Sequence, residues 1–258
     1  MIVGASAAPS PSPSGKLGVQ ATRNTWRDGS PVESGGENYP TDIYVVDVGR
    51  RHVRNVTRDE RTEYCWSWLP SGQAIVFASV PNDRMKAGPT HIDVVNRDGA
   101  RRRRLASGTG TLCPRLSPEG RRILFVAEGV RQRGLWVMQA DGRHKRRLTQ
   151  SHESDASWSP DGKRVVFVRE LPRNRSDIFV INADGTGLHR LTRTEAAESE
   201  PAWSADGERI VFIRGVGPWG LPFAMRRDGT SVKRLASTGH DSSRGCPARR
   251  GFSAAVPV

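Results

Sequence analysis

Residues 158–170 read WSPDGKRVVFVRE, and residues 203–215 read WSADGERIVFIRG. Two more copies, WLPSGQAIVFASV and LSPEGRRILFVAE, align with them when the glycine of each turn is the anchor. These anchors are Gly72, Gly120, Gly162 and Gly207. A second element, with a D-G turn followed by R-L-T or a close variant, recurs between the copies, and an earlier copy spans residues 42–57. The anchor glycines are separated by 48, 42 and 45 residues. Repetition at such a period indicates a repeat architecture.

Each turn of the first element has the chemistry of a tight hairpin. In Ser159-Pro160-Asp161-Gly162, the proline presets φ, the aspartate accepts hydrogen bonds from nearby amides, and the glycine accepts a positive φ. The VVFV run that follows and the later IFVI run are apolar on both faces, because successive strand residues point to opposite sides. Each repeat is therefore predicted to be a four-stranded antiparallel meander that is buried on both faces.

A sheet with two apolar faces needs another sheet on each side, and a ring of such sheets is a β-propeller. The repeat length is typical of propeller blades. The sequence shows neither the one-sided alternation of a β-sandwich nor the helical periodicity of βαβ units. We predict an all-β propeller of four-stranded antiparallel blades, with four complete repeats and one partial N-terminal repeat. The ring is then either five-bladed or an incomplete six-bladed one.

The repeated pattern P-x-W-S-x-D-G-x-x-I/V-V-F, followed by I-x-V-x-x-x-D-G and R-L-T, resembles the WD40-like propeller repeat of TolB-type proteins. The resemblance covers about residues 15–236. It implies a TolB-like propeller, and similar blades occur in bacterial envelope TolB proteins and in propellers that gate prolyl-oligopeptidase-like peptidases. This resemblance implies a role in protein or peptide interaction and a periplasmic or extracellular location, and a cytoplasmic location stays open as the alternative.

The two ends of the chain depart from the repeat. Residues 1–14 are rich in Pro and Ser and are predicted to be disordered, without an intact signal peptide, although Ala5-Ser6-Ala7 resembles the end of one. The first blade lacks an inner strand in the sequence pattern. Residues 237–258 form a degenerate tail, and three explanations stay open: a strand that closes blade one, a truncated six-bladed ring, or a blade destroyed by a frameshift.

The chain carries a formal net charge of +13, much of it from arginine on the fourth strand of the blades. Such cations protect an exposed sheet edge from pairing with another edge. The alternative is a site for an anionic polymer. The candidate residues are Arg101, Arg102, Arg103, Arg104, Lys145 and Arg146.

The loops that lead into the inner strands are acidic. Variable loops on a rigid scaffold are where binding is normally found. We therefore predict that this rim, at the mouth of the central channel, binds a protein or a basic peptide; a cationic ligand or Ca²⁺ is a further candidate, and solubility alone is the simpler explanation. The candidate residues are Glu63, Asp155, Glu198 and Glu200.

Cys65 and Cys113 each lie seven residues before an anchor glycine, so they are equivalent in neighbouring repeats, and Asp155 and Glu200 hold the same place in the next two. In an oxidising compartment the two cysteines would form a disulfide. The alternative is two small buried residues, because equivalent positions on adjacent blades can be too far apart. Trp68, Trp158 and Trp203 share another position and are predicted to pack between blades.

The sequence contains no G-x-S-x-G, H-E-x-x-H or G-x-x-x-x-G-K-S/T motif and no cysteine pairs at zinc spacing. We therefore expect a monomeric, non-enzymatic binding propeller without a cofactor or catalytic residues. An orphaned gating propeller of a prolyl-oligopeptidase-like enzyme and a polyanion-binding propeller are the two alternatives. No apolar run approaches the length of a membrane helix, so we expect no membrane span.

Overall fold

The computed structural model describes residues 10–11, 17–22, 41–47, 49–59, 61–81, 89–108, 113–129, 131–215 and 220–235. Within these residues, the chain forms five antiparallel sheets of four strands each, in sequence order. The same residues contain no helix that is long and apolar enough to cross a membrane. Residues 237–258, which the sequence marks as a degenerate tail, lie outside the described part of the chain.

The strands are short and evenly distributed over the sheets. Sheet 1 contains β1 (Ser10–Pro11), β2 (Leu17–Thr22), β3 (Thr41–Asp47) and β4 (His52–Asn55). Sheet 2 contains β5 (Arg61–Trp68), β6 (Ala74–Pro81), β7 (Thr90–Asn96) and β8 (Arg103–Gly108). Sheet 3 contains β9 (Arg115–Leu116), β10 (Arg122–Ala127), β11 (Gly134–Gln139) and β12 (Arg146–Arg147).

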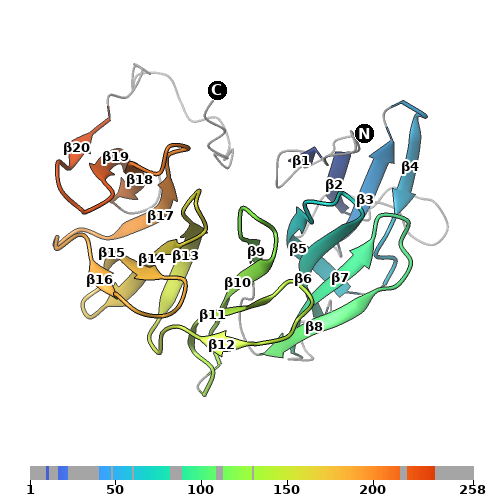
Figure 1. Cartoon of the computed structure of the whole chain (residues 1–258), viewed down its shortest axis with the longest axis horizontal. Helices are drawn as coiled ribbons and strands as arrows, with labels where there is room; N and C mark the ends of the chain where they lie inside the picture. The colour runs from blue at the N-terminus through green and yellow to red at the C-terminus, as the bar shows by residue number, and fades with distance from the viewer. Residues whose placement is uncertain are drawn as a thin grey trace, which may run out of the picture.

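The last two sheets repeat this plan. Sheet 4 contains β13 (Glu153–Trp158), β14 (Arg164–Leu171), β15 (Arg175–Asn182) and β16 (His189–Arg190). Sheet 5 contains β17 (Glu198–Trp203), β18 (Arg209–Arg214), β19 (Leu221–Arg226) and β20 (Lys233–Arg234). Figure 1 shows the five sheets in an arc, with β9, β13 and β17 toward its middle and β12, β16 and β20 on its outside.

Sheet 1 is more complete than the sequence pattern indicates. The two-residue strand β1 pairs with β2, with Pro11 opposite Leu17, and takes the inner position that appeared to be vacant in the sequence. It lies within residues 1–14, which were predicted to be disordered. Among the described residues, the inner edge of β2 is therefore already paired.

The predicted hairpin turn of sheet 4 is present in detail. Gly162 has φ 67°, and its N–H donates to the carbonyl of Ser159 at 2.8 Å. The Ser159 hydroxyl donates to Asp161 Oδ1 at 2.6 Å, and the Lys163 N–H donates to the same oxygen at 3.0 Å. The turn places Trp158 opposite Val165 on the next strand, which fixes the register of the hairpin.

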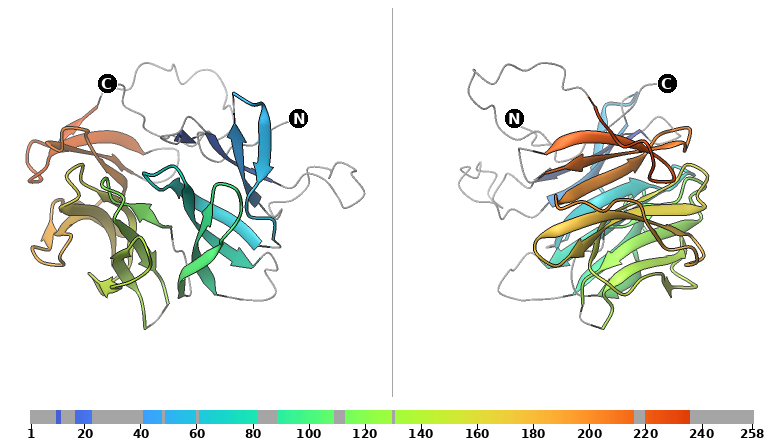
Figure 2. Two further views of the ribbon diagram at one scale, coloured as in Figure 1. Left: turned by 45° about the vertical axis from the view of Figure 1, so that its right-hand side comes forward. Right: turned by 90° about the vertical axis from the view of Figure 1, so that its left-hand side faces the viewer.

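The core lies between successive sheets, which lie one over the other in the right-hand view of Figure 2. Val166 and Ile178 of sheet 4 pack with Ile210 and Phe212 of sheet 5, and all four are almost completely buried. The same pattern holds between sheets 2 and 3 and between sheets 3 and 4. As predicted, Trp68 and Trp158 belong to these interfaces and are buried, while Trp203 is partly buried.

The threonine of R-L-T closes each of three sheets at its outer edge. Its hydroxyl oxygen accepts a hydrogen bond from a backbone N–H of the third strand, at 2.9 Å from Ile178 to Thr192 and from Leu135 to Thr149, and at 3.0 Å from Ile43 to Thr57 in the R-N-V-T variant of sheet 1. These residues are all buried, so the hydroxyl satisfies an amide that would otherwise have no hydrogen-bond partner. This contact explains why the sequence repeats a threonine at the end of the motif.

Candidate functional site

Three glutamates lie nine residues before the turn glycine: Glu153 and Glu198 begin the inner strands β13 and β17, and Glu63 is the third residue of β5. Their side chains are completely buried. Glu153 pairs with Arg169 at 2.8 Å, and Glu198 pairs with Arg214 at 2.9 Å, in both cases across the first two strands of one sheet. Burying a carboxylate is tolerated when a cation and hydrogen bonds compensate for lost hydration.

This burial corrects the prediction for two of the four acidic site residues. Glu63 and Glu198 were expected to face a partner at the channel mouth, but their carboxylates lie inside the protein. The rim sequence alone does not distinguish a carboxylate that faces solvent from one that faces an arginine on the neighbouring strand. Burial also raises the pKa of Glu198, which weakens its tendency to ionise.

The paired arginines also lie over aromatic rings. Arg169 is 4.6 Å from the ring centre of Phe179, and Arg214 is 4.5 Å from that of Phe223. Each arginine therefore joins a buried carboxylate to the aromatic pair of its own sheet. Such cation–π contacts are strongest where water is excluded.

Sheet 2 departs from this arrangement at two positions. Ser79 lies opposite Glu63, where sheets 4 and 5 have an arginine, and Asp93 lies opposite Phe77, where they have a second phenylalanine. Arg102, just before β8, fills the gap from the outer strand. Its guanidinium lies 5.0 Å from the ring centre of Phe77 and donates to Asp93 Oδ2 from Nε at 3.1 Å and from Nη2 at 2.7 Å.

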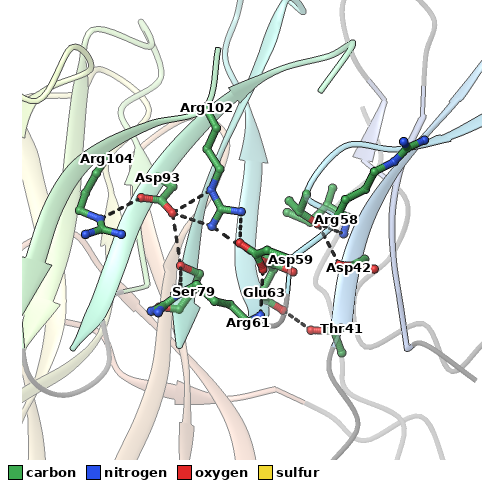
Figure 3. Close-up of polar contacts among 12 residues, drawn as sticks. Thr41, Asp42, Arg58, Asp59, Arg61, Glu63, Ser79, Asp93, Arg102 and Arg104 are labelled. Atoms are coloured by element: carbon green, nitrogen blue, oxygen red, sulfur yellow. Dashed lines mark hydrogen bonds and ion pairs between the residues drawn. The ribbon is translucent and has the colours of Figure 1, made fainter. Parts of the chain in front are cut away.

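The Arg102 cluster, shown in Figure 3, consists of Arg102, Asp59, Glu63, Ser79 and Asp93. Arg102 also bonds Asp59, and its Nη2 lies 3.9 Å from Glu63 Oε1. Burial and the neighbouring Asp59 raise the pKa of Glu63 to about 9, so this carboxyl holds its proton at neutral pH. Sequence reasoning missed the role of Asp93 and Ser79, although comparing equivalent strand positions across the repeats marks both as departures.

The remaining two acidic residues, Asp155 and Glu200, are exposed. Each lies at a β-bulge of an inner strand, with φ 47° at Asp155 and 53° at Glu200, a conformation that residues other than glycine rarely adopt. The Glu200 N–H donates to Asp155 Oδ2 at 3.2 Å, which links the two neighbouring inner strands. Strained backbone of this kind is often associated with functional sites.

Cys65 occupies the equivalent bulge in sheet 2, with φ 50°. It is joined by a disulfide to Cys113, which precedes β9, and the two Cα atoms are 5.1 Å apart. Neighbouring inner strands are thus close enough for this bond, contrary to the concern that their spacing would prevent it. At this position of the inner strand, sheets 2 and 3 therefore carry the two cysteines of a disulfide. Sheets 4 and 5 carry two acidic residues that are joined by a hydrogen bond.

Most other acids of the same rim are paired with arginine. Asp59 bonds Arg102, and Glu195 bonds Arg175 at 2.9 Å. The predicted acidic rim therefore reduces to Asp155 and Glu200 as its inward-lying exposed carboxylates among the residues described. The same residues include no group of three or more His, Cys, Asp or Glu side chains that could hold a metal ion.

The basic candidate residues divide into two groups. Arg103 donates to the carbonyl of Asp141 at 2.8 Å, and Arg146 donates to the carbonyls of Asp184 and Ala183 on the next sheet. Arg54 makes the same contact with Asp98 at 3.1 Å, so this fourth-strand position joins each of three sheets to its successor. Arg102 pairs with Asp93 in its own cluster, and Arg104 Nε lies 3.7 Å from the same carboxylate, which leaves Arg101 and Lys145 as the more freely exposed members of the basic set.

The sequence matches no protein-family model and no curated protein. Solved structures are similar to this chain. TolB from Acinetobacter baumannii has a TM-score of 0.63 at 20% identity, over 90% of this chain and 54% of that chain. The putative TolB from Agrobacterium tumefaciens has a TM-score of 0.62 at 18% identity, over 88% of this chain and 79% of that chain.

The chain has a TolB-like β-propeller fold. The prediction of this fold, with blades of four antiparallel strands, is confirmed. A puromycin-hydrolysing peptidase from Mycobacterium tuberculosis is similar as well, with a TM-score of 0.66 at 15% identity, over 91% of this chain and 39% of that chain. The TolB-like propeller thus spans about half of the Acinetobacter protein and a smaller part of the peptidase, and the likeness concerns the fold.

Proposed function

We propose that this TolB-like propeller is a non-enzymatic binding scaffold that holds a cationic group of a protein or peptide at the mouth of its ring. The observation that carries the proposal is the linked pair of Asp155 and Glu200. Both side chains are exposed, both lie on inner strands, and both backbones are held in a strained bulge. The Glu200 N–H holds the Asp155 carboxylate in place, and two neighbouring carboxylates attract a cation.

Sheets 2 and 3 carry no charge at the position that Asp155 and Glu200 hold in sheets 4 and 5, and this difference supports a ligand with one charged end. The Cys65–Cys113 disulfide is uncharged and links the inner strands of sheets 2 and 3. A peptide that crosses the mouth would place its lysine, arginine or amino terminus near sheets 4 and 5. Its uncharged part would lie near the disulfide.

The disulfide also favours a location outside the cytosol. Structural disulfides persist in oxidising compartments such as the periplasm and the extracellular space. We infer that the chain works in such a compartment, as the resemblance to envelope TolB proteins implies.

The test uses short fluorescent peptides that differ only in a central Lys, Gln or Glu, with affinity measured by fluorescence anisotropy. The Lys peptide should bind at least about tenfold more tightly than the Glu peptide at low salt. The double variant Asp155→Asn/Glu200→Gln should lose that preference. The matched control Asp206→Asn/Glu208→Gln, on the opposite rim of sheet 5, should keep it. Equal binding of the three peptides, or an unchanged preference in the first variant, would reject the proposal.

A further inference from the structure

Basic side chains follow the outer edge of sheets 1, 2 and 3. Figure 1 shows the fourth strands β4, β8 and β12 on the outside of the arc. Within residues 49–54, 97–104 and 140–147, the acids are Asp98 and Asp141. We call the following exposed residues of these stretches the basic track: Arg50, Arg51, Arg54, Arg101, Arg103, Arg143, His144, Lys145 and Arg146.

Three arginines of the basic track are held in place by the following sheet. Arg54 donates to the Asp98 carbonyl at 3.1 Å, and Arg103 donates to the Asp141 carbonyl at 2.8 Å. Arg146 donates to two carbonyls of sheet 4. A carbonyl carries no net charge, and among the described residues no carboxylate pairs with these three guanidiniums, so they keep their positive charge. A guanidinium has five N–H donors, so each of them has donors left for a ligand.

Arginines at other positions of the repeat are neutralised within the protein. Arg169 pairs with Glu153 at 2.8 Å, and Arg190 pairs with Asp177. Both of these carboxylates are completely buried. The protein thus supplies a carboxylate where an arginine lies in its own interior, whereas the basic track leaves its charge for an anion from outside.

The backbone of the second turns favours the same interpretation. The second residue after the glycine of each turn has a left-handed φ, which is 50° at Arg51, 54° at Arg101 and 51° at His144. Sheet 4 has Gly187 at this position, which adopts such a φ without strain, and sheet 5 has Ser231. Residues other than glycine are strained in this conformation, and strained positions are common at functional sites. Sheets 1 to 3 therefore place a basic side chain where glycine would fit more easily.

The basic track continues from one sheet to the next. Arg54 reaches the second turn of sheet 2, three residues before Arg101. Arg103 likewise reaches the second turn of sheet 3, two residues before Arg143. In sheet 4, His189 takes the place of these bridging arginines, and the track ends there.

We propose that the basic track binds a flexible acidic polysaccharide, whose sulfate or carboxylate groups contact sheets 1, 2 and 3 in succession. Planar anions of this kind match the fork of an arginine, which can donate two parallel hydrogen bonds to one group. Repeated contacts by one chain gain affinity, because the second and third contacts are made at a high effective concentration.

The surface favours a polysaccharide over other polyanions. The large apolar side chains exposed in the described residues are Val53, Leu188, Val232 and Leu235, none of which is aromatic. Single-stranded nucleic acid is usually held by aromatic rings that stack on its bases. A DNA duplex is stiff over about 50 nm and a membrane is planar, so neither follows the outside of the arc as a flexible chain does.

The first experiment measures, by fluorescence anisotropy, the binding of a labelled heparin fragment of about twelve sugars at low salt. The variant Arg54→Gln/Arg103→Gln/Arg146→Gln should bind it at least about tenfold more weakly than the unchanged protein does, and with a shallower salt dependence. Absence of heparin binding by the unchanged protein would overturn the proposal.

The matched control removes the same charge from the opposite rim. Arg131→Gln/Arg173→Gln/Arg193→Gln changes three exposed arginines in the connections on that rim and should alter the affinity by less than about twofold. Equal weakening in the two triple variants would show that net charge alone attracts the ligand and would reject the track as its site.

A third variant separates ligand binding from the contacts between sheets. Arg101→Gln/Arg143→Gln/Lys145→Gln changes exposed members of the track that do not bridge two sheets in the described structure. The thermal unfolding midpoint should therefore stay the same, while the affinity for the heparin fragment should fall at least about fivefold. An unchanged affinity in this variant would mean that the basic residues serve stability alone.

Further comparisons test the class of ligand. An oligothymidylate of equal charge and vesicles of phosphatidylglycerol should bind more weakly than the heparin fragment, and tighter binding of either would overturn the assignment. A fragment of about four sugars should bind at least about tenfold more weakly than the longer one, and equal affinities would show that the site does not extend over three sheets. Asp155→Asn/Glu200→Gln should not weaken heparin binding, so this result is independent of the function proposed for the mouth of the ring.

Discussion

The guanidinium of Arg102 lies 5.0 Å from the ring centre of Phe77, taking the role that Arg214 has over Phe212 in sheet 5. The two arginines reach equivalent rings from different strands, since Arg214 ends β18 whereas Arg102 precedes β8. Sheet 2 thus keeps the cation of the repeat although its second strand carries Ser79 in place of the arginine. Asp93, buried opposite Phe77, depends on that cation.

Removing the cation should therefore destabilise the protein strongly. In Arg102→Met, Asp93 keeps a buried carboxylate without its main partner, and we expect a loss of about 3 kcal/mol in the free energy of unfolding. The matched control is Arg101→Met, whose arginine is exposed and should change stability by less than about 0.5 kcal/mol. Urea unfolding measures both values, and similar losses in the two variants would contradict the role assigned to Arg102.

Glu63 should make stability depend on pH in the direction opposite to an ordinary paired carboxylate. Its pKa is about 9 in the folded protein and near 4.5 when unfolded, so the folded state binds the extra proton between these values. This contribution to stability is complete below about pH 4.5 and is lost as the pH rises toward 9.

Glu63→Gln has no such proton to lose. Its stability relative to the unchanged protein should increase steadily from pH 5 to pH 9, by up to about 1.4 kcal/mol per pH unit. Thermal or urea unfolding across this range measures the difference. A difference that stays constant with pH would show that Glu63 is ionised in the folded state.

The second turn of each repeat should tolerate a methyl group only where the preceding sheet leaves room. Gly229 and Gly185 have φ values of 85° and 84°, so alanine strains both backbones equally. A Cβ at Gly229 would lie 2.8 Å from the Leu191 carbonyl oxygen, whereas one at Gly185 would meet its nearest atom at 3.6 Å. We expect Gly229→Ala to cost about 1 kcal/mol more than Gly185→Ala in unfolding experiments. Equal costs would mean that the sheets separate easily at this contact.

The disulfide should contribute to stability because it joins two inner strands across a loop of 48 residues. Replacing both Cys65 and Cys113 by Ser should lower the free energy of unfolding by about 2–4 kcal/mol. A reductant should produce a similar shift in the unchanged protein and none in the variant. If the reductant leaves the thermal midpoint of the unchanged protein where it was, the bond is not formed in solution.

Much of the fold is predictable because the residues that recur in each repeat make the same contacts between successive sheets. The turn Ser159-Pro160-Asp161-Gly162 has a local physical reason and is found as expected, whereas the role of the threonine of R-L-T is seen only in the structure. The tryptophans were predictable for the same reason, since a large apolar residue at a fixed position of a repeat must face the neighbouring sheet.

The site was less predictable because its electrostatics depend on residues far apart in sequence. The acidic loops resemble a charged rim, yet Glu198 is neutralised by Arg214 on the next strand. Asp59 is paired with Arg102, which is 43 residues away. Spacing shows that Cys65 and Cys113 are equivalent, but only the structure, with their Cα atoms 5.1 Å apart, shows that they are within bonding reach.

In sheet 2 the arginine that pairs with the buried acid comes from just before the fourth strand and not from the second strand, so the strands of this sheet depend on one another. Transplanting β6 and β7 of sheet 2 into the context of sheet 4 would import Asp93 and Ser79 but leave Arg102 behind. The hybrid would then hold Asp93 in its interior without Arg102, which donates two hydrogen bonds to it in sheet 2. A working exchange of these strands would have to move the outer strand with them, although the blades look interchangeable in sequence.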